Sequence, residues 1–225
     1  MSVKLASTRD IVVLDSGSGI RELGLDLMRT MGEHSGNLHL FLTHAHWDHI
    51  QGFPFFVPAF VPSFSLDIYC SKDARDILSR QMSPPFFPVG LDAMGAKQQF
   101  HLLDGKGRVE VGEGCIRNIP LPHPQESTAF RVEERGVSLV FATDTEHNEN
   151  GVNESLAELA QGTDVLIYDA QYTLEEYEKK RGWGHSTFTE AVRLAQTAGA
   201  KQLILYSHDP THDDETLLEI EKAAQ

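Results

Sequence analysis

The most constraining feature of this sequence is a dense histidine cluster that directly follows an apolar stretch. Residues 38–43 predict a buried strand, and residues 44–49, His-Ala-His-Trp-Asp-His, place three imidazoles and one carboxylate within six positions. Functional groups at a strand end are typical of catalytic loops on a rigid sheet. Imidazole and carboxylate are ligands of zinc, and similar sites accept manganese, iron or cobalt. The sequence therefore predicts a sheet that presents a metal-binding loop.

The cluster has room for two metal positions. In an extended or tightly turned loop, His44 and His46 point to one side, while Asp48 and His49 lie one step further along the chain. We therefore expect this one loop to serve two neighbouring ions. We expect Trp47, inside the cluster, to pack the loop and not to meet the substrate.

The rest of the chain alternates short strands with helices. Residues 11–14 predict a strand that stops at the turn-rich residues 15–19, and a helix should follow that ends at Gly32 or Gly36. Further strands are predicted over 66–70, 98–103, 108–111, 115–120, 128–133, 137–143, 164–169 and 201–207, with helix N-caps at Asn153, at Thr187 in a capping box, and at Asp213 or Asp214. We find no repeat or linker, so we expect one domain over residues 1–225 with an α/β fold, sheet on sheet and helices outside.

Three more candidate ligands stand at the ends of predicted strands. His123 lies in Pro-His-Pro after residues 115–120, Asp144 lies in Thr-Asp-Thr, and His208 lies in Ser-His-Asp. Each is a weak signal alone. Their repetition at strand ends predicts that they complete a metal site with the cluster.

Together these motifs resemble the metallo-β-lactamase superfamily over nearly the whole chain. Asp15 with Gly17 and Gly19 also resembles the early Asp-x-Gly motif of that family. The resemblance implies a four-layer αββα sandwich with a two-metal site along one edge of the sheets. By position it implies that one metal is held by His44, His46 and His123 and the other by Asp48, His49 and His208, with Asp144 bridging both and Asp15 supporting the cluster from beneath.

The amino terminus departs from the family pattern. Relatives usually carry another strand and a Gly-Gly-Asn-Thr stretch before the strand that begins here near residue 11. We therefore expect that one sheet lacks an N-terminal edge strand or that a partner subunit covers this edge.

The last third of the chain resembles the ribonuclease Z and phosphodiesterase branch. Asp169 opens Asp-Ala-Gln-Tyr and His185 lies in Gly-His-Ser-Thr, and in that branch such a carboxylate and histidine form a pair beside the metals. The resemblance implies a binuclear metal-dependent phosphodiesterase, in which Asp48 orients a metal-activated hydroxide and His185 gives a proton to the leaving alkoxide. The plainer alternative is that His185 only neighbours a helix cap. True β-lactamases carry Cys in place of Asp144, which argues against antibiotic hydrolysis.

The charge balance bears on the substrate. With 19 Lys and Arg against 33 Asp and Glu, the net charge of −14 repels nucleic-acid backbones, and the long basic arm with which ribonuclease Z grips transfer RNA is missing. We expect a small anionic substrate, such as a cyclic nucleotide, and no large nucleic acid. The Phe/Pro-rich stretches 52–64 and 82–89 should pack on the core or on a partner, although Phe55, Phe56, Phe86 and Phe87 are available to stack on a base.

Two other functions fit the same residues. Hydrolysis of a thioester, lactone or other acyl bond would not need His185. A non-hydrolytic iron-binding redox or sensory module is the second alternative, although its relatives generally carry Glu in place of His46. We expect two divalent ions, with zinc first and manganese or iron as alternatives, because the same ligands serve all three.

The remaining features indicate the cellular setting. Cys70 and Cys115 are far apart and should be reduced, and the apolar run 11–14 is too short for a signal peptide or a membrane span. We expect a cytoplasmic homodimer without membrane contact. The histidines outside the site are expected to be surface or packing residues; they are His34, His39, His101, His147 and His212. Trp183 is expected either to pack or to meet the substrate.

Overall fold

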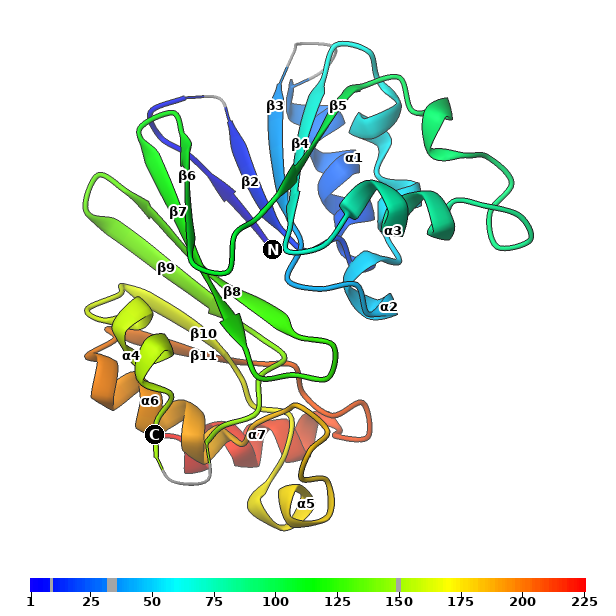
Figure 1. Ribbon diagram of the computed structural model, residues 1–225. Helices are drawn as coiled ribbons and strands as arrows, with labels where there is room; N and C mark the ends of the chain where they lie inside the picture. Colours follow the sequence, from blue (N-terminus) through cyan, green and yellow to red (C-terminus); the bar gives the residue numbers. More distant parts are fainter. Residues whose placement is uncertain (9, 32–35, 149–150) are drawn as a thin grey trace. The chain divides into compact units, whose positions relative to one another are not determined.

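The structure is a computed structural model that describes residues 1–8, 10–31, 36–148 and 151–225. It forms two compact units: residues 1–104 with 111–113 make the N-terminal unit, and residues 105–110 with 114–225 make the C-terminal unit (Figure 1). Each unit has its own sheet and its own apolar core. The expectation of a single domain stays a prediction. Gly32, one of the two expected helix ends, and His34 lie outside the described residues.

The N-terminal unit is built on a five-stranded mixed sheet with the order β1-β2-β3-β4-β5. Its strands are β1 (Ser2–Lys4), β2 (Ile11–Leu14), β3 (Asn37–Phe41), β4 (Ser65–Cys70) and β5 (Lys97–Leu102). Strands β2 to β5 run parallel, and β2 is buried along its whole length, as an apolar run in a parallel sheet should be. Strand β1 pairs antiparallel with β2, so this sheet has an N-terminal edge strand and the expectation that it lacks one is wrong.

The helices of this unit pack on its sheet and on each other. They are α1 (Ile20–Met31), α2 (Trp47–Ile50), α3 (Ala74–Gln81) and the 3-10 helices η1 (Phe53–Phe55), η2 (Val57–Phe60) and η3 (Leu91–Ala93). The amphipathic helix α1 buries Ile20 and Leu27. A Cβ added at Gly24 would lie 3.0 Å from the ring of Phe56, so α1 packs closely on the segment that joins η1 to η2.

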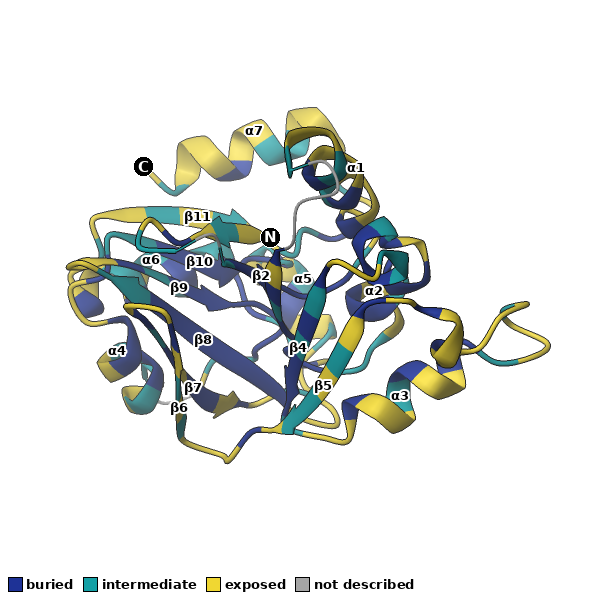
Figure 2. Cartoon of the chain, turned by 90° about the horizontal axis from the view of Figure 1, so that it is seen from above, coloured by how far each residue is buried: buried dark blue, intermediate teal, exposed yellow. Residues whose placement is uncertain are grey.

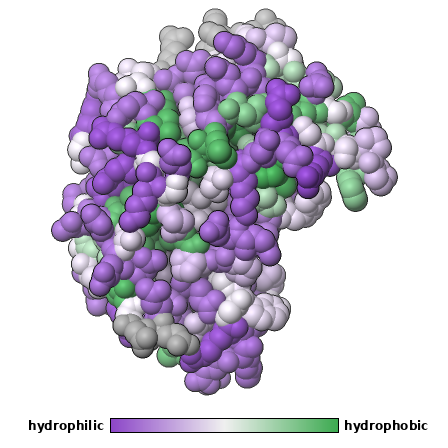
Figure 3. Space-filling view, viewed as in Figure 1, coloured by the Kyte–Doolittle hydropathy of each residue, from purple (hydrophilic) through white to green (hydrophobic). Residues whose placement is uncertain are grey.

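The Phe/Pro-rich segments divide between core and surface. Phe53 and Phe56 are buried in the apolar core, whereas Phe55 is 55% and Phe86 is 75% exposed. Phe87 packs partly on the core and meets the ring of Phe55 edge-on at 5.7 Å. Figure 3 shows hydrophobic side chains on the loop between α3 and η3. Core packing is thus confirmed for Phe53 and Phe56, and burial excludes Phe56 as a stacking residue.

The C-terminal unit is built on a six-stranded mixed sheet with the order β11-β10-β9-β8-β7-β6. Its strands are β6 (Gly107–Val111), β7 (Gly114–Leu121), β8 (Ser127–Glu134), β9 (Val137–Ala142), β10 (Val165–Asp169) and β11 (Gln202–Tyr206). Strands β7 to β9 are antiparallel and β9 to β11 are parallel. The predicted hairpin between β8 and β9 turns at Arg135 and Gly136, both with positive φ, which matches the twist of the strands.

Side-chain caps begin the helices of the C-terminal unit. These helices are α4 (Glu154–Ala160), α5 (Leu174–Lys179), α6 (Phe188–Ala198) and α7 (Asp214–Ala223), with caps at Asn153, Thr173, Thr187 and Asp213. The caps at Asn153, Thr187 and Asp213 confirm the predicted helix starts. The complete capping box joins Thr173 to Glu176 and begins α5, a helix that the sequence patterns missed. In Figure 2, β8 and β10 are largely buried and α7 is largely exposed.

Two mixed sheets with helices confirm the expected α/β class and are consistent with the αββα sandwich. In the part of the chain that the structure describes, no helix has both the length and the apolar character needed to cross a bilayer.

Candidate metal centre

The histidine cluster lies where β3 passes into α2. His44 and His46 belong to the loop before α2, and Asp48 and His49 belong to the helix itself. The ring of His44 lies 4.4 Å from that of His46 and 4.2 Å from that of His49, measured between centroids. Asp48 is exposed, and its Oδ2 lies 3.2 Å from Nε2 of His49. The N-terminal unit thus gathers all four predicted ligands of this segment.

Asp15 and Thr43 orient two of these imidazoles. Nδ1 of His49 lies 2.7 Å from Oδ2 of Asp15, and Nδ1 of His44 lies 3.0 Å from the Thr43 hydroxyl. Asp15 also accepts the backbone N–H of Thr43 at 2.7 Å. These bonds engage Nδ1 and leave Nε2 as the ligand atom of both rings, which is how partners behind a metal site fix a tautomer. Asp15 therefore holds the supporting position that the family resemblance implies.

Gly17 and Gly52 allow the loop after Asp15 to approach α2 closely. A Cβ at Gly17 would lie 2.4 Å from the carbonyl oxygen of Asp48, and a Cβ at Gly52 would lie 2.1 Å from the carbonyl oxygen of Gly17. A side chain at either position would push the turn away from the cluster. The early Asp-x-Gly motif is therefore a packing requirement of the site.

In the C-terminal unit, Asp144 lies between two imidazoles. Its Oδ2 is 3.9 Å from Nε2 of His123 and 4.0 Å from Nε2 of His185, too far for hydrogen bonds. The distance to His123 is short enough for these two side chains to hold one cation. Nδ1 of His123 lies 2.8 Å from the carbonyl oxygen of Gly184, so this ring also keeps Nε2 as its ligand atom. The side chains of His123 and Asp144 are nearly completely buried. The donor types and their spacing fit a divalent cation.

Asp169 and His185 form the predicted pair. Nδ1 of His185 lies 2.7 Å from Oδ2 of Asp169, a residue with no solvent exposure at the end of β10. The carboxylate also accepts the backbone N–H groups of Asp144, Gln171 and Ser186. Burial raises the pKa of Asp169, and the hydrogen bond from His185 offsets part of this rise. Ligand atoms of Asp144, Asp169 and His185 lie within 4.8 Å of one another.

Backbone strain marks three of the strand ends. Asp15 after β2, Asp144 after β9 and Ser207 after β11 have φ values of 61°, 55° and 56°. A residue with a side chain rarely adopts this left-handed region, and such outliers concentrate at functional sites. Ser207 also donates its hydroxyl to Oδ1 of Asp144 at 3.2 Å.

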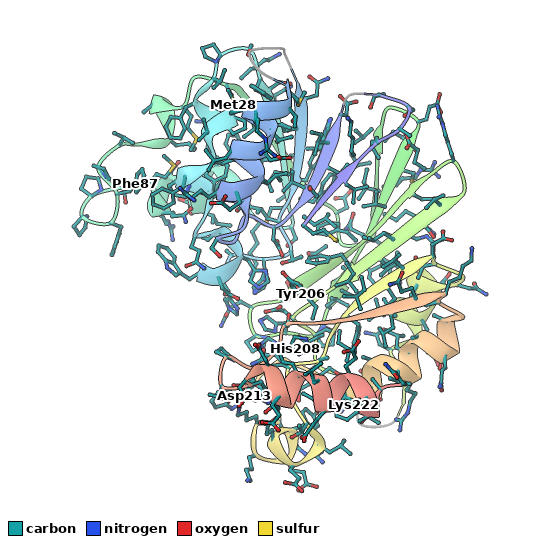
Figure 4. The ribbon with its side chains drawn as sticks, turned by 180° about the vertical axis from the view of Figure 1, so that it is seen from behind. Met28, Phe87, Tyr206, His208, Asp213 and Lys222 are labelled. Atoms are coloured by element: carbon teal, nitrogen blue, oxygen red, sulfur yellow. The ribbon has the colours of Figure 1, made fainter. Side chains whose placement is uncertain are left out.

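His208 is the predicted ligand that the structure does not bring into a ligand group. Among the described residues, it belongs to no set of three or more neighbouring candidate ligands, and its Nδ1 has no hydrogen-bond partner there. Figure 4 shows it at the end of β11 beside α7. Burial lowers its pKa. It lines a groove of about 740 Å³ together with Leu203, Ile204, Leu205, Leu217 and Leu218. Its role as a ligand stays a prediction.

Glu146 is a site residue that sequence reasoning missed. Its Oε1 accepts the Tyr177 hydroxyl at 2.9 Å and the N–H of Gly182 at 2.8 Å, and its Oε2 accepts the N–H of Gly184 at 3.0 Å. One carboxylate thus holds the loop that precedes His185. The only sequence signal was its position directly after Thr-Asp-Thr.

The other described histidines have packing partners, as expected. His101 pairs with Asp67 at 2.7 Å, His147 lies 3.0 Å from the Ser186 hydroxyl, and His212 lies 3.0 Å from Glu176. His39 stacks on Tyr69. Trp47 is 59% exposed, so the expectation that it packs the loop is wrong.

The fold and the donor set define a metal-dependent hydrolase of the metallo-β-lactamase type. Residues 12–208 match the family described as Beta-lactamase superfamily domain, and the protein belongs to this family.

Three known proteins align with most of the chain. A Ribonuclease Z from Methanothermobacter thermautotrophicus is 24% identical over 100% of this chain and 85% of its own length. The structure of human tRNase Z, short form, superposes with a TM-score of 0.70, 20% identity and coverage of 93% of this chain and 85% of that chain. Yeast PDE1 gives a TM-score of 0.63, 13% identity and coverage of 95% and 85%. At these identities the two structures establish the fold.

Proposed function

We propose that this protein is a binuclear metal-dependent phosphodiesterase that acts on a small phosphodiester such as a cyclic nucleotide. The observation that carries the proposal is the pair of Asp169 and His185 next to Asp144, because acyl hydrolysis on the same scaffold does not need such a pair. The names of the relatives, ribonuclease Z and PDE1, support the same class of bond.

The proposed ligands follow the family pattern. His44, His46 and His123 would hold one ion, Asp48, His49 and His208 the other, and Asp144 both. The orientation of His44, His49 and His123 through Nδ1 supports this assignment, because each ring keeps Nε2 for a cation. Bound divalent ions would supply Lewis-acid polarisation of the phosphate and lower the pKa of water to about 7. Zinc is the first expectation, and manganese or iron accept the same donors.

His185 is the proposed general acid. Asp169 accepts from Nδ1, which directs Nε2 of His185 toward the space beside Asp144, where the leaving oxygen would lie. The buried carboxylate also stabilises the protonated imidazole before it gives its proton away. Proton donation of this kind contributes about 10² to 10⁴ in rate. Asp48, exposed on α2, would orient the attacking water.

The net charge supports a small substrate. A chain with a charge of −14 repels long polyanions, whereas a cation in the site attracts a single phosphodiester. We therefore propose that precursor transfer RNA is not the substrate. A homodimer is part of the proposal, and gel filtration tests it.

The test is hydrolysis of bis(p-nitrophenyl) phosphate by protein reloaded with zinc or manganese, with His185→Ala beside it. The matched control is His101→Ala, because His101 pairs with Asp67 at the same 2.7 Å as His185 with Asp169. We expect metal-dependent turnover that falls about tenfold or more only in His185→Ala. Turnover of a thioester or lactone but not of the phosphodiester, from protein with two bound ions, would replace the proposal by the acyl alternative. An iron content with visible absorption and no hydrolysis would replace it by the redox alternative.

A further inference from the structure

Trp183 is a large exposed aromatic side chain on a tightly held loop. Trp183 is 62% exposed and lies between Gly182 and Gly184, whose φ values are 80° and 86°. Its own N–H donates to the carbonyl oxygen of Lys180 at 3.1 Å. A single exposed indole on a flexible loop is an ordinary surface feature. Here hydrogen bonds fix the backbone on both sides of the indole, and an exposed aromatic ring on a fixed backbone suggests a binding role.

The carboxylate of Glu146 supplies that anchor. Its two oxygens accept the N–H groups of the two glycines that flank Trp183, at 2.8 Å and 3.0 Å. The Tyr177 hydroxyl binds the same carboxylate, and the N–H of Glu146 donates to the carbonyl oxygen of Pro122 at 2.8 Å. We call the Glu146 carboxylate with the N–H groups of Gly182 and Gly184 the glycine clamp. It fixes the backbone from which the indole projects.

The clamped loop is continuous with the catalytic histidines. The carbonyl oxygen of Gly184 lies 2.8 Å from Nδ1 of His123, and a Cβ at Gly184 would lie 2.4 Å from the same nitrogen. His185, the proposed proton donor, follows directly. Trp183 is therefore two residues from His185, which would donate the proton to the leaving oxygen.

We propose that Trp183 is a stacking platform for a planar ring on the leaving-group side of the phosphodiester, and that the ring is a nucleobase. This inference rests on the proposed function, since it assigns a substrate class to the same site. A clamped indole costs little ordering on binding, because its backbone is already fixed, and base–aromatic stacking accepts any base. The substrate class is then a nucleoside phosphodiester and not a sugar or glycerol phosphodiester.

The first test needs no catalysis. The chain has two tryptophans, so Trp47→Phe leaves Trp183 as the only indole and Trp183→Phe leaves Trp47, which is equally exposed. Zinc-reloaded samples of both are titrated with adenosine 5′-monophosphate and with ribose 5-phosphate, and indole fluorescence is recorded. We expect saturable quenching only for adenosine 5′-monophosphate in the Trp47→Phe protein. Equal quenching in both proteins, or none in either, would overturn the platform.

The second test separates the platform from the proposed function. Adenosine 2′,3′-cyclic phosphate and glycerol 1,2-cyclic phosphate are compared as substrates of Trp183→Ala and of Leu174→Ala, a truncation of another exposed apolar residue in the C-terminal unit. We expect Trp183→Ala to lower kcat/KM about tenfold for the nucleotide alone, through KM. Equal kcat/KM for the nucleotide in Trp183→Ala and wild type would overturn the platform and leave the phosphodiesterase intact. No turnover of either compound by wild type would overturn the function, and the fluorescence titration would still decide base binding.

Discussion

Oδ2 of Asp169 lies 2.7 Å from Nδ1 of His185 and also accepts the backbone N–H of Asp144 at 3.0 Å. One buried oxygen therefore sets both the tautomer of the proposed acid and the backbone of the proposed bridging ligand. Because the residue has no solvent exposure, water cannot replace either bond.

Replacing this carboxylate should damage chemistry and stability together. In Asp169→Asn, one donor that now hydrogen-bonds to a carboxylate oxygen would face an amide N–H group instead. We therefore expect kcat to fall about 10- to 100-fold. We also expect the free energy of unfolding to fall by about 1–3 kcal/mol. Steady-state kinetics and urea unfolding measure the two effects. Asp67→Asn, which removes the partner of His101, is the control and should keep kcat. An Asp169→Asn protein with wild-type kcat would show that the pair has no catalytic role.

The two glycines of the clamp should differ sharply in their tolerance of alanine. A Cβ at Gly184 would lie 2.2 Å from Pro124 and 2.4 Å from Nδ1 of His123, whereas among the described residues nothing lies within 4 Å of a Cβ at Gly182. Both positions have positive φ, so each alanine costs roughly 1 kcal/mol of backbone strain. We expect Gly184→Ala to lose bound metal and several degrees of Tm beyond the loss in Gly182→Ala. Metal analysis and thermal unfolding decide, and equal behaviour of the two variants would contradict the close packing.

Loss of the Glu146 carboxylate should free the indole of Trp183. Glu146→Gln keeps the size of the side chain but replaces an acceptor oxygen by an amide group, so at least one of the bonds to Gly182 and Gly184 breaks. In the Trp47→Phe background, we expect lower fluorescence anisotropy of Trp183 and weaker quenching by adenosine 5′-monophosphate. Glu175→Gln, on the exposed side of α5, is the control. Unchanged anisotropy in Glu146→Gln would mean that the loop holds its shape without the carboxylate.

The capping box of α5 should give a pH-dependent stability. Burial alone would raise the pKa of Glu176, but hydrogen bonds from Thr173 and His212 outweigh it and lower the pKa below its ordinary value. A lowered pKa contributes stability that is complete above the unfolded value of about 4.3 and is lost as the pH falls through the folded value. We expect Glu176→Gln, which keeps an acceptor for the box but loses the negative charge near the helix N-terminus, to cost about 0.3–1 kcal/mol at neutral pH. The difference from wild type should shrink below about pH 4. Urea unfolding at several pH values measures it, with Glu175→Gln as control. A difference that grows on acidification would reverse the assignment.

Metal removal should lower stability as well as activity. A ligand that binds only the folded state stabilises it by RT ln(1 + [L]/Kd), which is about 2.7 kcal/mol at a hundredfold excess over Kd. We expect a chelator to lower Tm and added zinc to restore it. Asp144→Asn should show a much smaller zinc response than His101→Ala, because Asp144 lies between His123 and His185. Equal zinc responses in both variants would place the stabilising metal elsewhere.

Every strand except β1, most helix starts and the positions of the donors could be predicted from the sequence. The apolar runs 11–14 and 137–143 predict buried strands without any knowledge of the rest of the fold, and the structure has strands over 11–14 and 137–142. Caps such as Asn153 and Thr187 accept a hydrogen bond from a residue only three positions further on. Asp169 and His185 were paired from their motifs, and the structure places them 2.7 Å apart. These features depend on local chemistry or on a family pattern, so they could be predicted from the sequence.

Contacts between groups far apart in the sequence are set by the folded structure. Glu146 reaches Gly182 and Gly184 from 36 and 38 residues away, and Asp15 reaches His49 from 34 residues away, distances that no local pattern encodes. Burial also depends on the folded structure. Phe56 and Phe86 lie in segments of similar Phe/Pro-rich composition, but Phe56 is buried and Phe86 is exposed. Periodicity specifies a residue's face on its own element, whereas burial and hydrogen bonding depend on what packs against that face. The orientation of the imidazoles and the clamp beneath Trp183 are therefore properties of the folded chain.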